Sequence, residues 1–214
     1  MKAQGSLQAG PSMRDEVRQV TIELLLRHGY QGLRFRDIAD RLGTTRANIH
    51  YHFGSKLNLC EDVVTGYVER TLEKWETNWF GDKSLEAKIE GMMEANRARY
   101  LEFNPTGRTA NPWSLIGRMR LERDTIGPRA RQALLEFGKT LDRLVLTGVS
   151  QAIETGELVP DAPREAIALQ LVAVADSAGF ITQDGGDFRR LEQMYRSISL
   201  IVHKAYGTGK TGPG

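Results

Sequence analysis

The chain has 214 residues, of which 40% are hydrophobic and 26% are charged, and its formal net charge is +2. This length can bury a substantial core without disulfides, and the single cysteine, Cys60, excludes an internal disulfide framework and a multi-cysteine zinc site. We expect a cytoplasmic protein with no membrane partner, because the most apolar run, residues 166–181, is interrupted by Gln170 and Asp176.

Hydrophobic periodicity predicts helices along the whole chain and therefore an all-α fold of about nine helices. The predicted helices span residues 13–28, 36–42, 46–52, 56–79, 84–103, 112–123, 128–155, 163–182 and 188–205. Residues suited to helix N-caps precede several of them: Ser12, Thr45, Ser55, Ser84 and Asp187. Glycines stand where helices are expected to end: Gly29, Gly43, Gly156 and Gly207.

Composition and helix spacing divide the chain into four segments. The polar, glycine-rich ends, residues 1–12 and 207–214, are predicted to be disordered tails. Residues 13–55 are predicted to form a small N-terminal domain of three helices. Residues 56–206 are predicted to form a larger helical domain.

Residues 35–53, FRDIADRLGTTRANIHYHF, have the pattern of a helix-turn-helix. Ala39 allows two helices to cross closely, Gly43 can leave the first helix in the left-handed conformation, and Ile49 anchors the second helix. Residues 13–58 hold eight cationic and five acidic side chains, a bias compatible with a polyanion partner. An ordinary helical hairpin with a polar surface is the alternative interpretation.

Residues 13–60, including GYQG at 29–32, DIADRLG and TTRANIHYHFGSK, resemble the N-terminal DNA-binding domain of the TetR family of bacterial regulators. The resemblance implies that the helix at 46–52 enters the major groove of double-stranded DNA. Thr45, Tyr51 and Lys56 then become phosphate contacts, while Thr44, Arg46 and Asn48 become contacts to base edges. The predicted DNA-binding set is completed by Arg34, Arg36, His50 and His52.

Two positions depart from the pattern of the family. His50 stands where tyrosine is usual, so that Tyr51 either takes over its phosphate contact or the contact is lost. Arg34 stands where threonine is usual, and its charge opposes the helix dipole but can neutralise a phosphate.

The larger domain carries no catalytic motif, and the prediction is a protein that is not an enzyme, with no catalytic residue and no cofactor. His50 and His52 point to different faces of a helix, so no metal site is predicted. Cys60 is interpreted as a small core residue, with a redox sensor as the alternative.

Aromatic and methionine side chains at helical spacing belong to the core by default, but such residues also line small-molecule pockets in helical bundles. The predicted ligand-binding residues are Trp75, Trp79, Met92, Asn96, Tyr100, Trp113, Arg118, Met119, Phe137 and Asp176.

The last two helices predict a homodimer. Residues 167–175 are apolar nearly all round and need burial on two sides, and residues 191–202 carry a second apolar stripe. The segment 156–180 also loosely resembles the start of the dimerising helices of the TetR family. The predicted interface consists of Ile167, Leu171, Val174, Leu191, Met194, Tyr195, Ile198, Ile201 and Val202.

Together these features predict a homodimeric transcriptional regulator, a repressor that an unknown small-molecule effector releases from a palindromic operator. The fourth helix is expected to transmit the conformational change from the ligand to the DNA-binding domain, because it begins at the phosphate-binding end and continues into the ligand domain. The alternative is an all-helical small-molecule enzyme or binding protein in which the helix-turn-helix is incidental.

Overall fold

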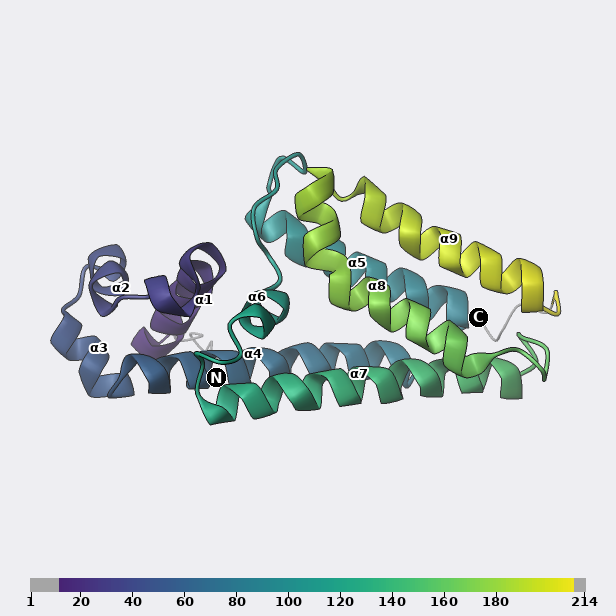
Figure 1. Cartoon of the computed structure of the whole chain (residues 1–214), viewed down its shortest axis with the longest axis horizontal. Coiled ribbons are helices and arrows are strands. Elements are labelled where there is room, and N and C mark those ends of the chain that lie inside the picture. Colours follow the sequence, from purple (N-terminus) through teal and green to yellow (C-terminus); the bar gives the residue numbers. More distant parts are fainter. Residues whose placement is uncertain (1–11, 210–214) are drawn as a thin grey trace, which may run out of the picture.

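The computed structural model describes residues 12–209, and within this range the chain is helical without strands, as predicted (Figure 1). The helices are α1 (Met13–Gly32), α2 (Phe35–Leu42), α3 (Arg46–Phe53), α4 (Lys56–Trp79), α5 (Leu85–Phe103), α6 (Leu115–Leu121), α7 (Pro128–Glu154), α8 (Arg164–Gly185) and α9 (Arg189–Tyr206). The predicted all-α fold class is confirmed.

Side-chain caps begin four of the described helices where the sequence places them. The hydroxyl groups of Ser12, Thr45, Ser55 and Ser84 each accept a hydrogen bond from a backbone N–H of the first helical turn. Asp187 is not an N-cap, because α9 begins one residue later, although its carboxylate still accepts a hydrogen bond from the Arg189 N–H at 3.0 Å.

The helix predicted at 112–123 is shorter, and α6 begins only at Leu115. The buried Asn104 side chain holds the preceding loop by accepting hydrogen bonds from the Thr109 hydroxyl and from the Asn111 N–H at 2.9 Å. This loop keeps residues 109–113 out of a helix. Ser114 then caps α6, a role that the sequence pattern did not reveal.

The first three helices pack around a small core of their own. Leu25 of α1, Ile38 of α2 and Ile49 of α3 are all fully buried. Gly43 has a φ of 60° in the turn between α2 and α3, a left-handed conformation that favours glycine. Gly29, at a φ of 66°, interrupts α1 where the sequence predicts its end.

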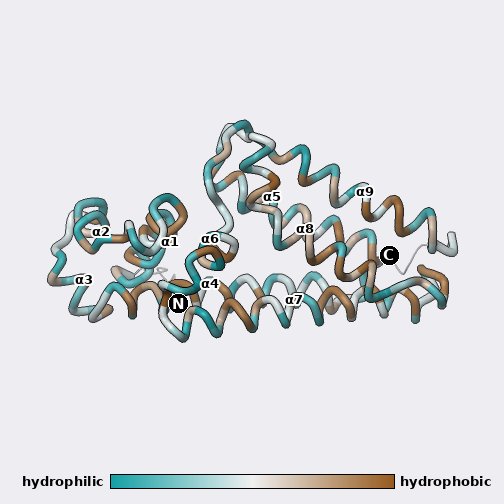
Figure 2. The backbone as a smooth tube through the Cα atoms, in the orientation of Figure 1, coloured by the Kyte–Doolittle hydropathy of each residue, from teal (hydrophilic) through white to brown (hydrophobic). Residues whose placement is uncertain are grey.

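The remaining helices form a larger body, in which α4 and α7 lie side by side and α5, α8 and α9 lie together on the other side (Figure 1). Hydrophobic and hydrophilic residues alternate along each helix (Figure 2), as expected when one side of a helix faces a core. The short helix α6 lies between the two bodies and contacts α1, α4, α7 and α8. It is therefore placed to connect them.

Helix α8 is long and apolar enough, by length and composition, to cross a membrane, so Gln170 and Asp176 do not make it too polar for a span, but one such helix is weak evidence of a membrane protein. The helix packs against α7 and α9, and its side chains Ile167, Leu171 and Val174 are buried there. Its apolar composition is thus partly explained by the core of the chain itself.

The C-terminal end is ordered further than predicted. Gly207 forms an isolated β-bridge with Leu158, and the Thr208 N–H donates to the carbonyl oxygen of Glu157 at 3.0 Å. These backbone hydrogen bonds hold residues that the prediction placed in a disordered tail. The rest of the predicted tails, residues 1–11 and 210–214, lies outside the described residues.

Candidate functional site

Helix α3 is anchored by its apolar residues and presents its polar residues to solvent. Ile49 is fully buried and Phe53 is nearly so, whereas the Tyr51 side chain is 84% exposed. The Thr45 hydroxyl accepts from the Asn48 N–H at 3.1 Å, which fixes the start of the helix. The buried positions thus orient the helix, and the exposed ones are free to contact a partner.

The structure places the predicted DNA-binding residues on the surface formed by α3 and the adjacent ends of α2 and α4. Six of these residues are exposed: Arg34, Arg36, Thr45, Arg46, His50 and Tyr51. Four are half-buried: Thr44, Asn48, His52 and Lys56. The Asn48 amide donates to the Thr44 hydroxyl at 3.0 Å, so these two side chains are held in one orientation.

Lys56 has a partner within the chain that the sequence did not predict. Its ammonium group donates to the Tyr30 carbonyl oxygen at 3.0 Å and lies 4.5 Å from the centre of the Tyr30 ring. Lys56 therefore ties the start of α4 to the end of α1. A phosphate contact from this residue stays a prediction.

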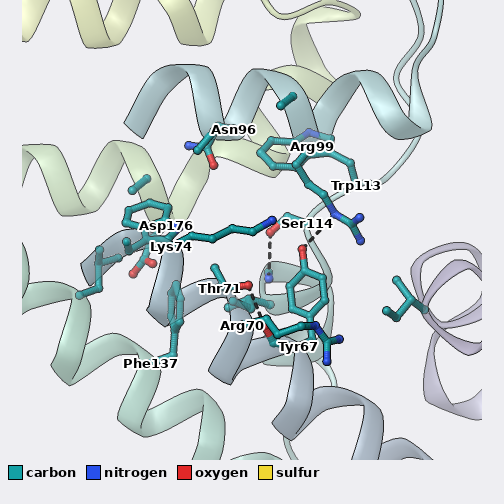
Figure 3. A pocket seen from close by; sticks show the side chains of 18 of the residues that line it. Tyr67, Arg70, Thr71, Lys74, Asn96, Arg99, Trp113, Ser114, Phe137 and Asp176 are labelled. Atoms are coloured by element: carbon teal, nitrogen blue, oxygen red, sulfur yellow. Dashed lines mark hydrogen bonds between the residues drawn. The ribbon is translucent and has the colours of Figure 1, made fainter. Parts of the chain in front are cut away.

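A cavity of about 320 Å³ lies among α1, α4, α5, α6, α7 and α8 (Figure 3). The aromatic side chains of Trp75, Trp113 and Phe137 line it, as does the buried Asn96. Asp176 lines it too and forms an ion pair with Arg120 at 2.7 Å. These five predicted ligand-binding residues are brought together, although they come from distant parts of the sequence.

The other five predicted ligand-binding residues do not line this cavity. Trp79, Met92 and Met119 are buried in the core. Tyr100 donates its hydroxyl to the Thr109 carbonyl oxygen at 2.8 Å. Arg118 forms an ion pair with Glu122 at 3.0 Å. Helical spacing alone could not separate these side chains from the cavity wall, because core and cavity residues share the same apolar faces.

The cationic residues of the cavity are those that sequence reasoning missed. They are Arg70, Lys74, Arg99 and Arg120. Tyr67, Arg70, Thr71 and Lys74 follow the i, i+3, i+4 spacing of one helix face, a signal that was available but carried less weight than the aromatic residues. Prediction from aromatic and methionine content therefore recognised the apolar wall and overlooked the charged one.

Arg99 is held against this cavity by aromatic neighbours. Its Nε donates to the Tyr67 hydroxyl at 3.1 Å, and its guanidinium lies 4.6 Å from the centre of the Phe103 ring. It also forms an ion pair with Glu102. Burial raises the pKa of Tyr67 above its ordinary value, so this phenol remains a neutral hydrogen-bonding partner near neutral pH.

Helix α6 connects the cavity with the N-terminal domain. Ser114, Ile116 and Gly117 line the cavity, and the Glu122 carboxylate beyond the end of α6 accepts from the Tyr30 N–H at 2.7 Å. Gln19 and Ile22 of α1 also line the cavity. A molecule in the cavity would therefore touch both α1 and the helix that holds the end of α1.

Cys60 is fully buried, and burial raises the pKa of its thiol to about 12. A thiol that stays protonated and inaccessible is a poor nucleophile. The environment of Cys60 agrees with the core role expected from the sequence.

The predicted dimer interface stays a prediction, but most of its residues are buried within the single chain. Ile167, Leu171, Val174, Leu191, Tyr195 and Val202 are buried inside the single chain, and Met194 and Ile198 are partly buried. Only Ile201, at 63%, is well exposed. The exposed apolar residues of α8 and α9 instead include Leu169, Phe180 and Leu200. A nearly all-apolar helix has two faces, and most of the residues predicted for the interface lie on the face that packs within the chain.

Residues 18–63 match the family described as bacterial regulatory proteins, tetR family. The chain is 25% identical over 194 residues to the HTH-type transcriptional repressor AcnR of Corynebacterium glutamicum, a match that covers 89% of this chain and 93% of the relative. AcnR of Corynebacterium diphtheriae is 24% identical over 194 residues, covering 90% and 92%.

Solved structures of transcriptional regulators share the fold. A TetR transcriptional regulator from Legionella pneumophila aligns with a TM-score of 0.71 at 18% identity, covering 92% of this chain and 100% of that one. A putative transcriptional regulator from Saccharomonospora viridis in complex with choline aligns with a TM-score of 0.70 at 18% identity, covering 91% and 97%. The helical arrangement is thus shared over nearly the whole chain.

Proposed function

Because the chain belongs to the TetR family of bacterial regulatory proteins and is a DNA-binding regulator, we propose that it is a homodimeric repressor controlled by a small molecule bound in the cavity. Residues 13–55 would form the DNA-binding domain, and residues 56–206 the effector-binding and dimerisation domain. The observation that carries the proposal is the exposed polar face of α3, with Arg46, His50 and Tyr51, on a helix fixed by the buried Ile49.

The operator should be a palindrome of double-stranded DNA, because a two-fold dimer presents two α3 helices to successive major grooves. A mobility-shift assay with the DNA upstream of its own gene, and with duplexes selected from a random library, tests this proposal. Selection of a palindrome would support a dimeric repressor. Absence of any sequence preference would instead favour the alternative, a helical enzyme or binding protein with an incidental helix-turn-helix.

We expect Arg46→Ala to weaken operator binding by about 1–3 kcal/mol, mainly through one base pair in each half-site. Arg46 is exposed at the first position of α3, where a guanidinium can reach a base edge. Lys83→Ala is the matched control, because it also removes an exposed cation but lies beyond the other end of α4. Equal affinities of both variants and the wild type would show that Arg46 does not read the operator.

The proposed dimer uses the outer faces of α8 and α9. Leu169 is 69% exposed and Phe180 is 45% exposed, and Ala173 and Ser177 lie between them on the same face of α8. Ile201 on α9 is also exposed. These residues form an apolar surface with small side chains at its centre, which allows close packing of two copies.

We expect Leu169→Glu to shift the chain from dimer to monomer, raising the dimer dissociation constant by at least about tenfold because each interface would bury two carboxylates. Sedimentation velocity over a range of protein concentrations measures this shift. Leu135→Glu on α7 is the control, because Leu135 is similarly exposed at 54% but lies away from the proposed face. A Leu169→Glu variant that remains as dimeric as this control would argue against the α8–α9 interface.

Coupling between the cavity and DNA is proposed to pass through α6 and the end of α1 as well as along α4. Glu122 contacts the Tyr30 backbone, and Lys56 at the start of α4 contacts the Tyr30 carbonyl oxygen. A change in α6 would therefore alter the position of α1 relative to α4. A solved neighbour in complex with choline supports a small molecule as the source of such a change.

We expect Glu122→Ala to reduce the reciprocal effect of effector and operator on each other. In the wild type each should weaken the binding of the other by the same factor, typically about 5- to 150-fold. Emission of Trp75 and Trp113, which line the cavity, reports ligand binding with and without operator. The variant should bind ligand normally in the absence of DNA. If its coupling factor equals that of the wild type, the signal does not pass through Glu122.

A further inference from the structure

We propose that the cavity binds a small organic anion, a carboxylate attached to an apolar body about the size of an aromatic ring. This inference rests on the proposed effector function, because it names the chemical class of the molecule that would occupy the cavity. It is carried by the distribution of charge over the lining residues and by one buried polar atom that has no hydrogen-bond partner among residues 12–209.

The charge of the lining is positive. Arg70, Lys74, Arg99 and Arg120 are four cations, whereas Glu102 and Asp176 are the two acidic residues. Both acids are already engaged, since Asp176 pairs with Arg120 at 2.7 Å and Glu102 pairs with Arg99. Within residues 12–209, Arg70 and Lys74 form no ion pair. The cavity therefore has cationic groups left over for a ligand.

Arg99 supplies the buried atom. Its Nε and one terminal nitrogen contact Tyr67 and Glu102, but Nη2 is buried and has no hydrogen-bond partner among the described residues. A buried donor without a partner is unfavourable, because the cost of removing it from water is not repaid. Because this atom is closed to solvent, the guanidinium would have to turn toward the cavity, where a carboxylate oxygen from a ligand would satisfy the donor with a charge-assisted hydrogen bond.

The rest of the wall fits an apolar body. Trp75 and Phe137 pack edge to face with their ring centres 6.3 Å apart, and Ile22, Ile116 and Leu141 complete the apolar lining. Figure 3 shows the Lys74 side chain extending across the cavity toward Ser114, on the side of Arg99 and away from Phe137. The carboxylate would lie at the Lys74 and Arg99 end, and the apolar body near Trp75 and Phe137.

A cationic ligand would instead place its charge beside Arg70, Lys74 and Arg99 with no free acidic partner in the lining. A neutral ligand would fill the apolar part but would leave the Arg99 donor with a weaker partner. The geometry therefore favours the anion over both.

Three probes with the same apolar body separate these cases: phenylbutanoate, phenylbutanamide and phenylbutylamine. Isothermal titration calorimetry of the full chain at neutral pH should show the carboxylate binding at least about tenfold more tightly than the amide, and the amine more weakly still. Equal or tighter binding of the amide or the amine overturns the proposal. So does the absence of binding by all three.

Lys74→Met and Arg99→Gln test the site itself. Each should lower the affinity for phenylbutanoate by about tenfold while changing the affinity for phenylbutanamide much less, because only the carboxylate carries a charge that these cations attract. Lys139→Met is the matched control, since Lys139 is an exposed lysine on α7 outside the cavity. If neither cavity variant changes carboxylate binding, the carboxylate does not bind at these residues. Melting temperatures of the variants show whether Arg99→Gln still folds. If it does not, Lys74→Met still tests the site, because Lys74 is exposed and its replacement should not disturb the core.

Operator binding is measured separately, so that the two proposals fail independently. Loss of the carboxylate preference with intact operator binding overturns the ligand class alone. A clear carboxylate preference that leaves operator affinity unchanged supports the anion site and argues against its role as an effector site.

Discussion

Trp79→Ala is expected to lower the free energy of unfolding by about 3–5 kcal/mol, the range for removing a fully buried aromatic side chain. Trp79 ends α4 and is 0% exposed. A Cβ added at Gly148 of α7 would clash with the Cε3 atom of Trp79, so the ring packs directly on the backbone of α7. Loss of the ring would leave a cavity between the two helices that contact each other most extensively. Urea unfolding followed by circular dichroism measures the change.

Two further variants show whether this loss comes from packing. Trp79→Phe should cost less, because Phe keeps part of the ring volume and removes the indole Nε1, which is buried without a hydrogen-bond partner among residues 12–209. Phe80→Ala, at the adjacent and 49% exposed position, should change stability by no more than about 0.5–1 kcal/mol. A Trp79→Ala variant as stable as Phe80→Ala would contradict the packing described here.

Glu157→Ala is expected to lower the free energy of unfolding by about 2–4 kcal/mol, because Glu157 joins three segments of the larger domain. Its buried carboxylate accepts from the Leu85 N–H at the start of α5, at 2.9 Å and 3.0 Å for its two oxygens. It also contacts His203 Nε2 of α9 at 3.0 Å. Removal of the carboxylate leaves the Leu85 N–H and the His203 imidazole without this hydrogen-bond partner. Glu157→Gln, which keeps an acceptor for the Leu85 N–H, should cost less.

The contact between Glu157 and His203 makes the free energy of unfolding depend on pH. The hydrogen bond with Glu157 raises the pKa of His203 above its ordinary value of 6.5, although burial opposes this. Burial alone would raise the pKa of Glu157, but its hydrogen bonds from His203 and the Leu85 N–H hold it below the ordinary value of 4.5. The histidine contribution is fully present below pH 6.5 and is lost as pH rises through the raised pKa. The glutamate contribution is present above pH 4.5 and is lost as pH falls through the lowered pKa.

The pair should therefore stabilise the fold most between pH 4.5 and pH 6.5. Unfolding of the wild type and of His203→Gln at a series of pH values checks this prediction. The stability difference between the two should shrink as pH rises from mildly acidic to alkaline. A difference that stays constant over this range would show that the His203 imidazole does not carry a charge in the contact.

The sequence by itself determined the helix-turn-helix and most helix boundaries. Ala39, Gly43 and Ile49 act at fixed short spacings, and the serine and threonine caps bond to backbone atoms three residues away. Such interactions depend on local backbone geometry, which a pattern of neighbouring residues specifies. The resemblance to the TetR family rests on the same short segment, and the family match covers residues 18–63.

Only the tertiary structure decided which faces of the later helices are inside. Residues 167–175 are apolar nearly all round, so they show no alternation of apolar and polar residues that would mark one face of the helix as buried. The sequence therefore did not show that Leu171 is buried in the chain and that Leu169 is exposed. The cavity likewise depends on six helices, which bring the charges of Lys74 and Arg99 beside aromatic side chains from other segments. Contacts between residues far apart in sequence arise from how whole helices pack, and local patterns do not encode that packing.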